Sequence, residues 1–171
     1  LIYDWGIMRK HILFLTLLVI SFNLSSRTID SIFVHSKFDE AIALQEKFQS
    51  KKALTILNEI LPDIKSSFGL NSRVTAQAYY HLASLQLDLA QYEEAKMLLN
   101  EAISIFKLLN ATSLEIGNTY MLLGIYYDYM AEYDKALAYY DLTKKIYLKL
   151  LPLTDYKFGY LYNNIGICIY F

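Results

Sequence analysis

The sequence predicts an all-α protein, a solenoid of antiparallel helical hairpins with a repeat of about 42 residues. The first observation is a series of small residues spaced 41 or 42 apart, namely Ala41, Ala83, Gly124 and Gly166. The second is a parallel series with the same step, twelve residues further on in each unit, namely Ala53, Ala95 and Ala136. Two small-residue series at a fixed offset indicate two helices per unit that approach each other closely.

The side chains around the small residues repeat as well. Each unit carries an aromatic, an aliphatic and a small residue at i, i+3 and i+4, which places them on one face of a helix. We therefore expect these residues to be structural anchors: Tyr79, Leu82, Ala83, Ala95, Tyr120, Leu123, Gly124, Ala136, Tyr162, Ile165 and Gly166. The polar pairs Ala90-Gln91 and Ala131-Glu132 are expected to form the turns within the hairpins.

The period divides the chain into three full units and one half unit. We place the units at residues 36–72, 73–114 and 115–156, and the half unit at 157–171. Loops are expected at 66–72 and 151–155, which are rich in turn residues. A final helix without its partner would expose an apolar face, which solenoids avoid, so the sequence predicts a fragment whose repeats continue after Phe171.

The third unit carries the fullest version of the motif, with Tyr120, Leu123, Gly124, Tyr127, Ala136, Tyr140 and Thr143. This pattern resembles the tetratricopeptide repeat (TPR) family. The resemblance implies a right-handed α-solenoid. The long unit is similar to that of kinesin light chains and of bacterial TPR signalling and CHAT-type proteins, as is the segment Tyr162-Asn163-Asn164-Ile165-Gly166.

The resemblance also implies that the first helix of each hairpin lines a concave, peptide-binding face. The corresponding positions are Tyr80, Ser84, Asn118, Met121, Ile125, Asp128, Tyr129, Tyr160, Asn163 and Asn164. Such a groove would be aromatic and amide-rich, and suited to an extended or helical peptide. A clamp for a terminal carboxylate is not expected, because basic residues are missing from these positions. The alternative is that many of the tyrosines only pack between hairpins.

The N-terminal part predicts export. Residues 12–24 are almost continuously apolar and follow Arg9, Lys10 and His11, the layout of a secretory signal. We assign residues 8–26 to a signal peptide or an uncleaved membrane-anchor helix that precedes the solenoid, and residues 1–7 to a non-native leader before Met8. The expected location is the periplasm, the medium or the membrane surface of a bacterium.

Composition argues against several classes of function. A net charge of −1 gives no basic footprint for nucleic acid. One cysteine, Cys168, and three histidines without metal-ligand spacing predict no metal, no cofactor and no catalytic residue. His81 is expected to be a partly exposed helix residue, and Cys168 a buried and inert thiol.

Three functions fit these observations. The first is a protein-protein interaction module that binds a protein or peptide in the concave groove, without catalysis. The second is the N-terminal sensing or substrate-binding region of a larger bacterial CHAT protease or histidine kinase. The third is a structural subunit that self-associates through the open C-terminal end.

Overall fold

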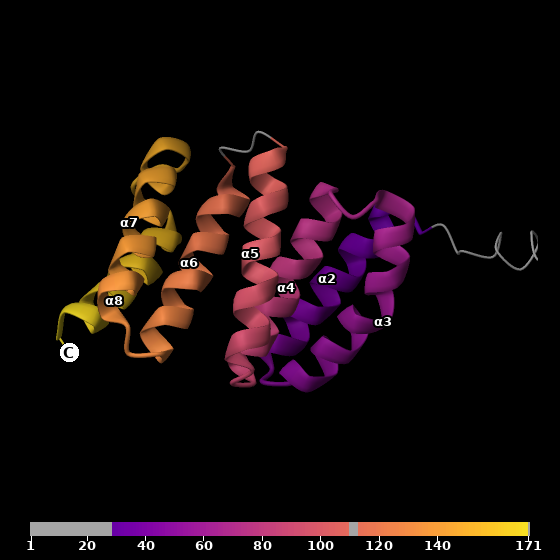
Figure 1. The fold of residues 1–171 in the computed structure, drawn as a ribbon, viewed down its shortest axis with the longest axis horizontal. Helices are drawn as coiled ribbons and strands as arrows, with labels where there is room; N and C mark the ends of the chain where they lie inside the picture. Colours follow the sequence, from indigo (N-terminus) through magenta and orange to yellow (C-terminus); the bar gives the residue numbers. More distant parts are fainter. Residues whose placement is uncertain (1–28, 110–112, 171) are drawn as a thin grey trace, which may run out of the picture.

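The structure is a computed structural model that describes residues 29–109 and 113–170. The predicted signal segment at 8–26 and the leader at 1–7 lie outside the described residues. In the described part the chain forms seven α-helices and no strand, arranged in a row (Figure 1). The helices are α2 (Ser31–Glu46), α3 (Ser50–Phe68), α4 (Arg73–Asp88), α5 (Tyr92–Leu108), α6 (Leu114–Tyr129), α7 (Tyr133–Leu150) and α8 (Tyr156–Tyr170).

The helices pair as the hairpins α2–α3, α4–α5 and α6–α7, followed by α8 as the first helix of a further unit. The first hairpin begins at Ser31, ahead of residue 36, where we expected the array to start. The first helices α2, α4, α6 and α8 contact one another in succession. Within the described residues, the second helices α3, α5 and α7 contact only first helices, so the first helices form the inner layer of the stack.

The three turns within the hairpins share one backbone geometry. Phe48, Ala90 and Ala131 have φ values of 58°, 57° and 55°, in the left-handed region. At the second turn, the N–H of Gln91 donates to the carbonyl of Gln86 (2.8 Å) and that of Ala90 to Leu87 (3.1 Å). The same pair of bonds closes the other two turns, and together they form the Schellman motif that usually contains glycine. The predicted turns are therefore present, and Phe48 adds one that we did not predict.

The small residues let the helices approach closely. Ala83, Ala95 and Ala136 are fully buried. Gly124 on α6 lies against the ring of Tyr140 on α7, where a Cβ atom would come within 2.2 Å of the ring. Such a contact forces the ring or one of the two helices to shift, so a larger residue is disfavoured at this position.

The anchors of the last unit differ from the prediction. The Tyr162 side chain is 49% exposed, and Ile165 is only half-buried. A Cβ atom at Gly166 would meet nothing within 4 Å. The reason is that the described chain places no second helix over this face of α8, whereas α7 covers the equivalent face of α6.

The second helices account for part of the long repeat. They contain 19, 17 and 18 residues, against 16 in each of α2, α4 and α6. The loop that we expected at 66–72 is shorter, because α3 continues to Phe68 and ends at Gly69 with φ 87°. The next helix starts at the N-cap Ser72, whose hydroxyl accepts the N–H of Thr75 at 3.1 Å.

Candidate functional site

A cavity of about 430 Å³ opens on the inner layer between α4, α6 and α8, and we call it the inner groove. Its apolar side chains come from α6, and its aromatic ones come from α4, α7 and α8. The lining residues are Tyr80, His81, Asn118, Met121, Leu122, Ile125, Tyr147, Tyr156, Lys157, Tyr160 and Asn164.

The polar groups of the inner groove are mostly uncharged. Burial raises the pKa of the Tyr80 hydroxyl to about 12 and also raises the pKa of Tyr147, so both phenols stay protonated at neutral pH. The Tyr147 hydroxyl donates to Asn118 Oδ1 at 2.8 Å. This bond fixes the orientation of the Asn118 amide and leaves its NH₂ group as a hydrogen-bond donor.

His81 contributes a neutral ring to the same groove. Its imidazole packs against Phe38 and Tyr80, with ring centroids 4.8 and 5.1 Å apart. Burial lowers the pKa of His81 to about 4. Among the lining residues in the described chain, Lys157 is therefore the one full charge at pH 7, and its Nζ donates to Tyr156 Oη at 2.9 Å.

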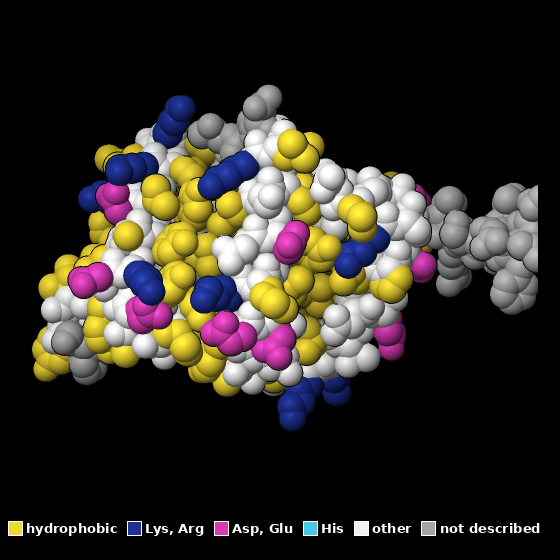
Figure 2. Space-filling model, in the orientation of Figure 1, with side chains coloured by type: hydrophobic (Ala, Val, Ile, Leu, Met, Phe, Trp, Pro, Cys, Tyr) yellow, Lys and Arg dark blue, Asp and Glu magenta, His cyan; other side chains and the backbone are white. Residues whose placement is uncertain are grey.

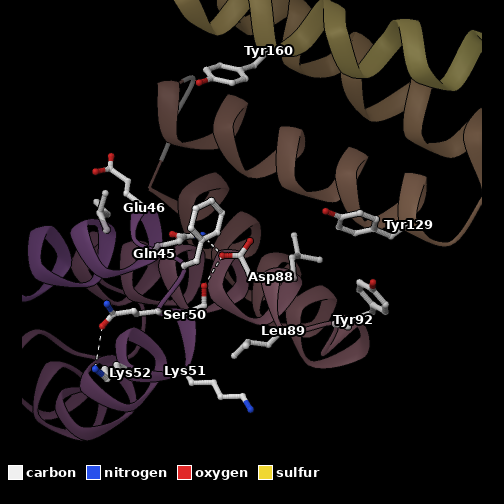
Figure 3. A pocket seen from close by; sticks show the side chains of 15 residues that line it. Gln45, Glu46, Ser50, Lys51, Lys52, Asp88, Leu89, Tyr92, Tyr129 and Tyr160 are labelled. Carbon is white, nitrogen blue, oxygen red and sulfur yellow. Dashed lines mark hydrogen bonds between the residues drawn. The ribbon is translucent and has the colours of Figure 1, made fainter.

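A second and larger cavity, of about 1170 Å³, lies beside the turns of the first two hairpins, and we call it the turn-edge cleft (Figure 3). Tyr129 of α6 and Tyr160 of α8 form its opposite wall. The remaining lining residues are Ile42, Gln45, Glu46, Phe48, Gln49, Ser50, Lys51, Lys52, Leu87, Asp88, Leu89, Ala90 and Tyr92. Since Tyr160 lines both cavities, the inner groove and the turn-edge cleft adjoin each other at this residue.

The structure brings together only part of the predicted binding set. The inner groove contains Tyr80, Asn118, Met121, Ile125, Tyr160 and Asn164, and the turn-edge cleft contains Tyr129 and again Tyr160. The remaining three, Ser84, Asp128 and Asn163, line neither cavity. Ser84 accepts a hydrogen bond from Gln45 Nε2 (3.0 Å), and Asp128 accepts one from Cys168 Sγ (3.6 Å).

Sequence reasoning missed two contributions. Tyr147 belongs to a second helix, which the family resemblance does not place on the concave face, yet its hydroxyl reaches α6. The turn-edge cleft was also missed, because its walls come from two hairpin turns and two later helices. The aromatic residue at the first turn, Phe48, was a possible signal, since the equivalent turn positions are alanine.

The Cys168 thiol is held in its protonated form. Cys168 is buried, and burial raises the pKa of its thiol to about 11, which keeps it protonated. Within residues 29–109 and 113–170, no three His, Cys, Asp or Glu side chains group closely enough to hold a metal ion. In the same ranges, no helix is both long and apolar enough to cross a membrane.

The face of the molecule shown in Figure 2 carries lysine and acidic side chains interspersed among apolar ones. Ion pairs in the described residues join Lys145 to Asp141 at 2.7 Å and Arg73 to Glu115 at 2.6 Å. No single sign of charge dominates this face, so it offers no extended basic stripe to a nucleic acid backbone.

Comparison with known proteins agrees with this geometry. A family model described as tetratricopeptide repeat matches residues 36–108 and again 75–149. Repeats of this kind serve as modules for protein-protein interaction and are typically non-catalytic. No match was found among curated protein sequences.

Among solved structures, the chain is similar to the crystal structure of BtubC (BKLC) from P. vanneervenii, with a TM-score of 0.71 at 19% identity. The match covers 84% of this chain and 58% of the BtubC chain, so this chain spans little more than half the length of that protein. The hairpin geometry, the small-residue contacts and the family match lead to one conclusion: the chain belongs to the tetratricopeptide repeat family, in its long-unit form.

Proposed function

We propose that the chain is a binding module whose inner groove holds an extended segment of a partner polypeptide. The observation that carries the proposal is the composition of the groove, in which neutral hydrogen-bonding groups surround an apolar floor. An extended peptide presents both N–H and C=O groups along its backbone, and it needs partners of both kinds. The amides of Asn118 and Asn164 offer donors and acceptors, and Met121 and Ile125 offer an apolar surface.

The hydrogen bond between Tyr147 and Asn118 supports this assignment. A free asparagine side chain loses rotational entropy when it binds a ligand, whereas an amide already held in place loses less. Tyr147 is only 3% exposed, so the surrounding core fixes the hydroxyl that donates to Asn118. The groove therefore presents at least one polar contact in a fixed orientation.

Selection from a phage-displayed library of random peptides on the immobilised chain tests the proposal. We expect selected peptides to bind with measurable affinity in solution, and we expect Asn164→Ala to weaken binding. Asn164 is half-buried in the groove, and thermal unfolding of the variant checks that its replacement spares stability. The matched control is Asn100→Ala, an exposed amide on α5 outside both cavities.

Two outcomes contradict the proposal. One is a library that yields no binding peptide. The other is a set of peptides whose affinity is changed equally by Asn164→Ala and by Asn100→Ala, since such peptides bind elsewhere on the surface.

Export stays a prediction that rests on residues 8–26 alone. Fusion of residues 8–35 to an alkaline phosphatase that lacks its own signal tests it in a bacterial host, because that enzyme becomes active only outside the cytoplasm. Phosphatase activity is expected, and its absence would contradict the predicted location. A longer protein with a CHAT protease or histidine kinase region is likewise a prediction, tested by the gene sequence on either side of the segment that encodes this chain.

A further inference from the structure

The turn-edge cleft differs from the inner groove in its electrostatics. Its floor carries the carboxylate of Asp88, at the C-terminal end of α4, and its rim carries Glu46. Lys51 and Lys52 line the same cleft from the side of α3, and Lys52 Nζ donates to Gln49 Oε1 at 3.1 Å. The cleft therefore contains charges of both signs.

The Asp88 carboxylate is held in a fixed orientation by the first hairpin. Gln45 Nε2 and Ser50 Oγ donate to Asp88 Oδ2 at 2.8 and 2.9 Å (Figure 3). Both bonds end on the same oxygen, and the residue remains exposed. Asp88 thus keeps its second oxygen, Oδ1, as an oriented acceptor for a group that enters the cleft.

Two tyrosine rings stand next to this carboxylate. Tyr92 and Tyr129 lie with their ring centroids 5.4 Å apart, on α5 and α6, and both line the cleft beside Asp88 (Figure 3). The pKa of the Tyr129 hydroxyl reflects this proximity. Burial raises this pKa most, and electrostatic interactions with Tyr92, Asp88 and Asp128 raise it further. Aromatic faces attract cations, and the attraction adds to that of a nearby carboxylate.

The rim of the cleft carries an exposed aromatic residue that the fold does not require. Phe48 is 97% exposed and sits at the left-handed turn position, where the other two hairpins have Ala90 and Ala131. A bulky residue at φ 58° is strained, and strain of this kind concentrates at binding sites. Phe48 lines the cleft together with Tyr160 and would cover the aliphatic part of a ligand bound there.

We propose that the turn-edge cleft binds a cationic side chain of a partner peptide, an arginine or lysine, between the Asp88 carboxylate and the rings of Tyr92 and Tyr129. Charge complementarity selects this occupant over an acidic peptide, because the oriented acceptor and both aromatic faces favour a positive group. Arginine is the better match, since its planar guanidinium both donates to a carboxylate and stacks on rings. The site extends the proposed peptide-binding function, because Tyr160 links the cleft to the inner groove.

Two matched peptide libraries test this inference on the full chain. One has arginine at a fixed central position with random residues around it, and the other has citrulline there, which keeps the shape and removes the charge. We expect binders from the arginine library to lose about tenfold in affinity when citrulline replaces arginine, the loss of one charge-assisted hydrogen bond. We expect Asp88→Asn to cause a similar loss for the arginine peptides and little change for the citrulline ones.

Two further variants separate a binding role from a structural one. Asp88→Asn keeps an acceptor for Gln45 and Ser50, so the fold is preserved, and thermal unfolding checks this. Tyr129→Phe keeps the ring and should retain binding of the arginine peptides, whereas Tyr129→Ala should weaken it. The control Glu59→Gln removes an exposed carboxylate of α3 outside the cleft and should have no effect.

The outcomes distinguish this inference from the proposed function. If both libraries yield binders of equal affinity that respond to Asn164→Ala but not to Asp88→Asn, the cationic site is wrong and the peptide-binding function stands. If neither library yields a binder, the proposed function fails, and the cationic site fails with it.

Discussion

Gly124 on α6 and Tyr140 on α7 form a close contact between the two helices of the third hairpin. A Cβ atom at position 124 would lie 2.2 Å from Tyr140 Cε1 and 2.5 Å from Cδ1, inside any real van der Waals contact. Tyr140 itself is fully buried. The glycine and the tyrosine are therefore a complementary pair, in which one residue makes room for the ring of the other.

Replacement of Gly124 by alanine is expected to destabilise the protein. Overpacking of a core typically costs about 1–3 kcal/mol. Alanine has a better helix propensity by about 1 kcal/mol, which offsets part of that cost. We expect the free energy of unfolding, measured by urea denaturation, to fall by about 1–2 kcal/mol for Gly124→Ala.

Gly166→Ala is the matched control, at the equivalent repeat position in α8. A Cβ atom there meets nothing within 4 Å, so only the helix propensity changes. We expect the free energy of unfolding to rise by up to about 1 kcal/mol. A similar loss in both variants would contradict the steric explanation, because it would point to a general intolerance of alanine.

Replacement by phenylalanine is expected to change the stability of the protein in opposite directions at Tyr140 and at Tyr147. Within the described residues, Tyr140 Oη is buried without a hydrogen-bond partner, whereas Tyr147 Oη donates to Asn118 at 2.8 Å. Removal of an unsatisfied buried polar group stabilises a protein by up to about 1 kcal/mol, and loss of an existing hydrogen bond destabilises it by about the same amount. Urea denaturation should therefore show higher stability for Tyr140→Phe and lower stability for Tyr147→Phe.

Replacement of Ala131 by glycine, in the turn of the third hairpin, is expected to stabilise the protein. An alanine with φ 55° pays a steric cost of about 1–2 kcal/mol that glycine avoids. Part of the gain is lost because glycine is more flexible in the unfolded chain. We expect Ala131→Gly to raise the midpoint of thermal unfolding, whereas Ala138→Gly, at an exposed position inside α7, should lower it.

The lowered pKa of His81 predicts that the protein loses stability in mild acid. Its pKa is about 4 in the folded protein because burial disfavours the charged ring, against 6.5 in an unfolded chain. The unfolded state therefore takes up the proton first as the pH falls below 6.5. Stability falls through this window and the loss levels off below about pH 4, where the folded state is protonated too.

Thermal unfolding measured from pH 7 to pH 4 for the natural chain and for His81→Leu checks this effect. Since leucine does not titrate, we expect a smaller decrease in the unfolding midpoint for the variant over this range. Equal slopes for the two proteins would show that other groups cause the pH dependence.

Three tyrosines at one repeat position differ in how deeply they are buried. Tyr79, Tyr120 and Tyr162 occupy the same repeat position, and sequence reasoning treats them alike. The structure keeps Tyr79 and Tyr120 half-buried beside the core and leaves Tyr162 49% exposed. The difference depends on whether a following helix covers the position, which local periodicity does not encode.

The sequence by itself determined the all-α hairpin repeat and most of its small-residue contacts. These features are encoded locally, because helical periodicity and the spacing of alanine and glycine act within one unit. Only the tertiary structure decided where the cavities lie and which tyrosines line them. Asp88 is oriented by residues of the preceding hairpin, and Tyr160 on α8 lines the same cleft as Phe48 of the first turn. Such contacts depend on how successive units stack, and the stacking is set by side-chain packing between units.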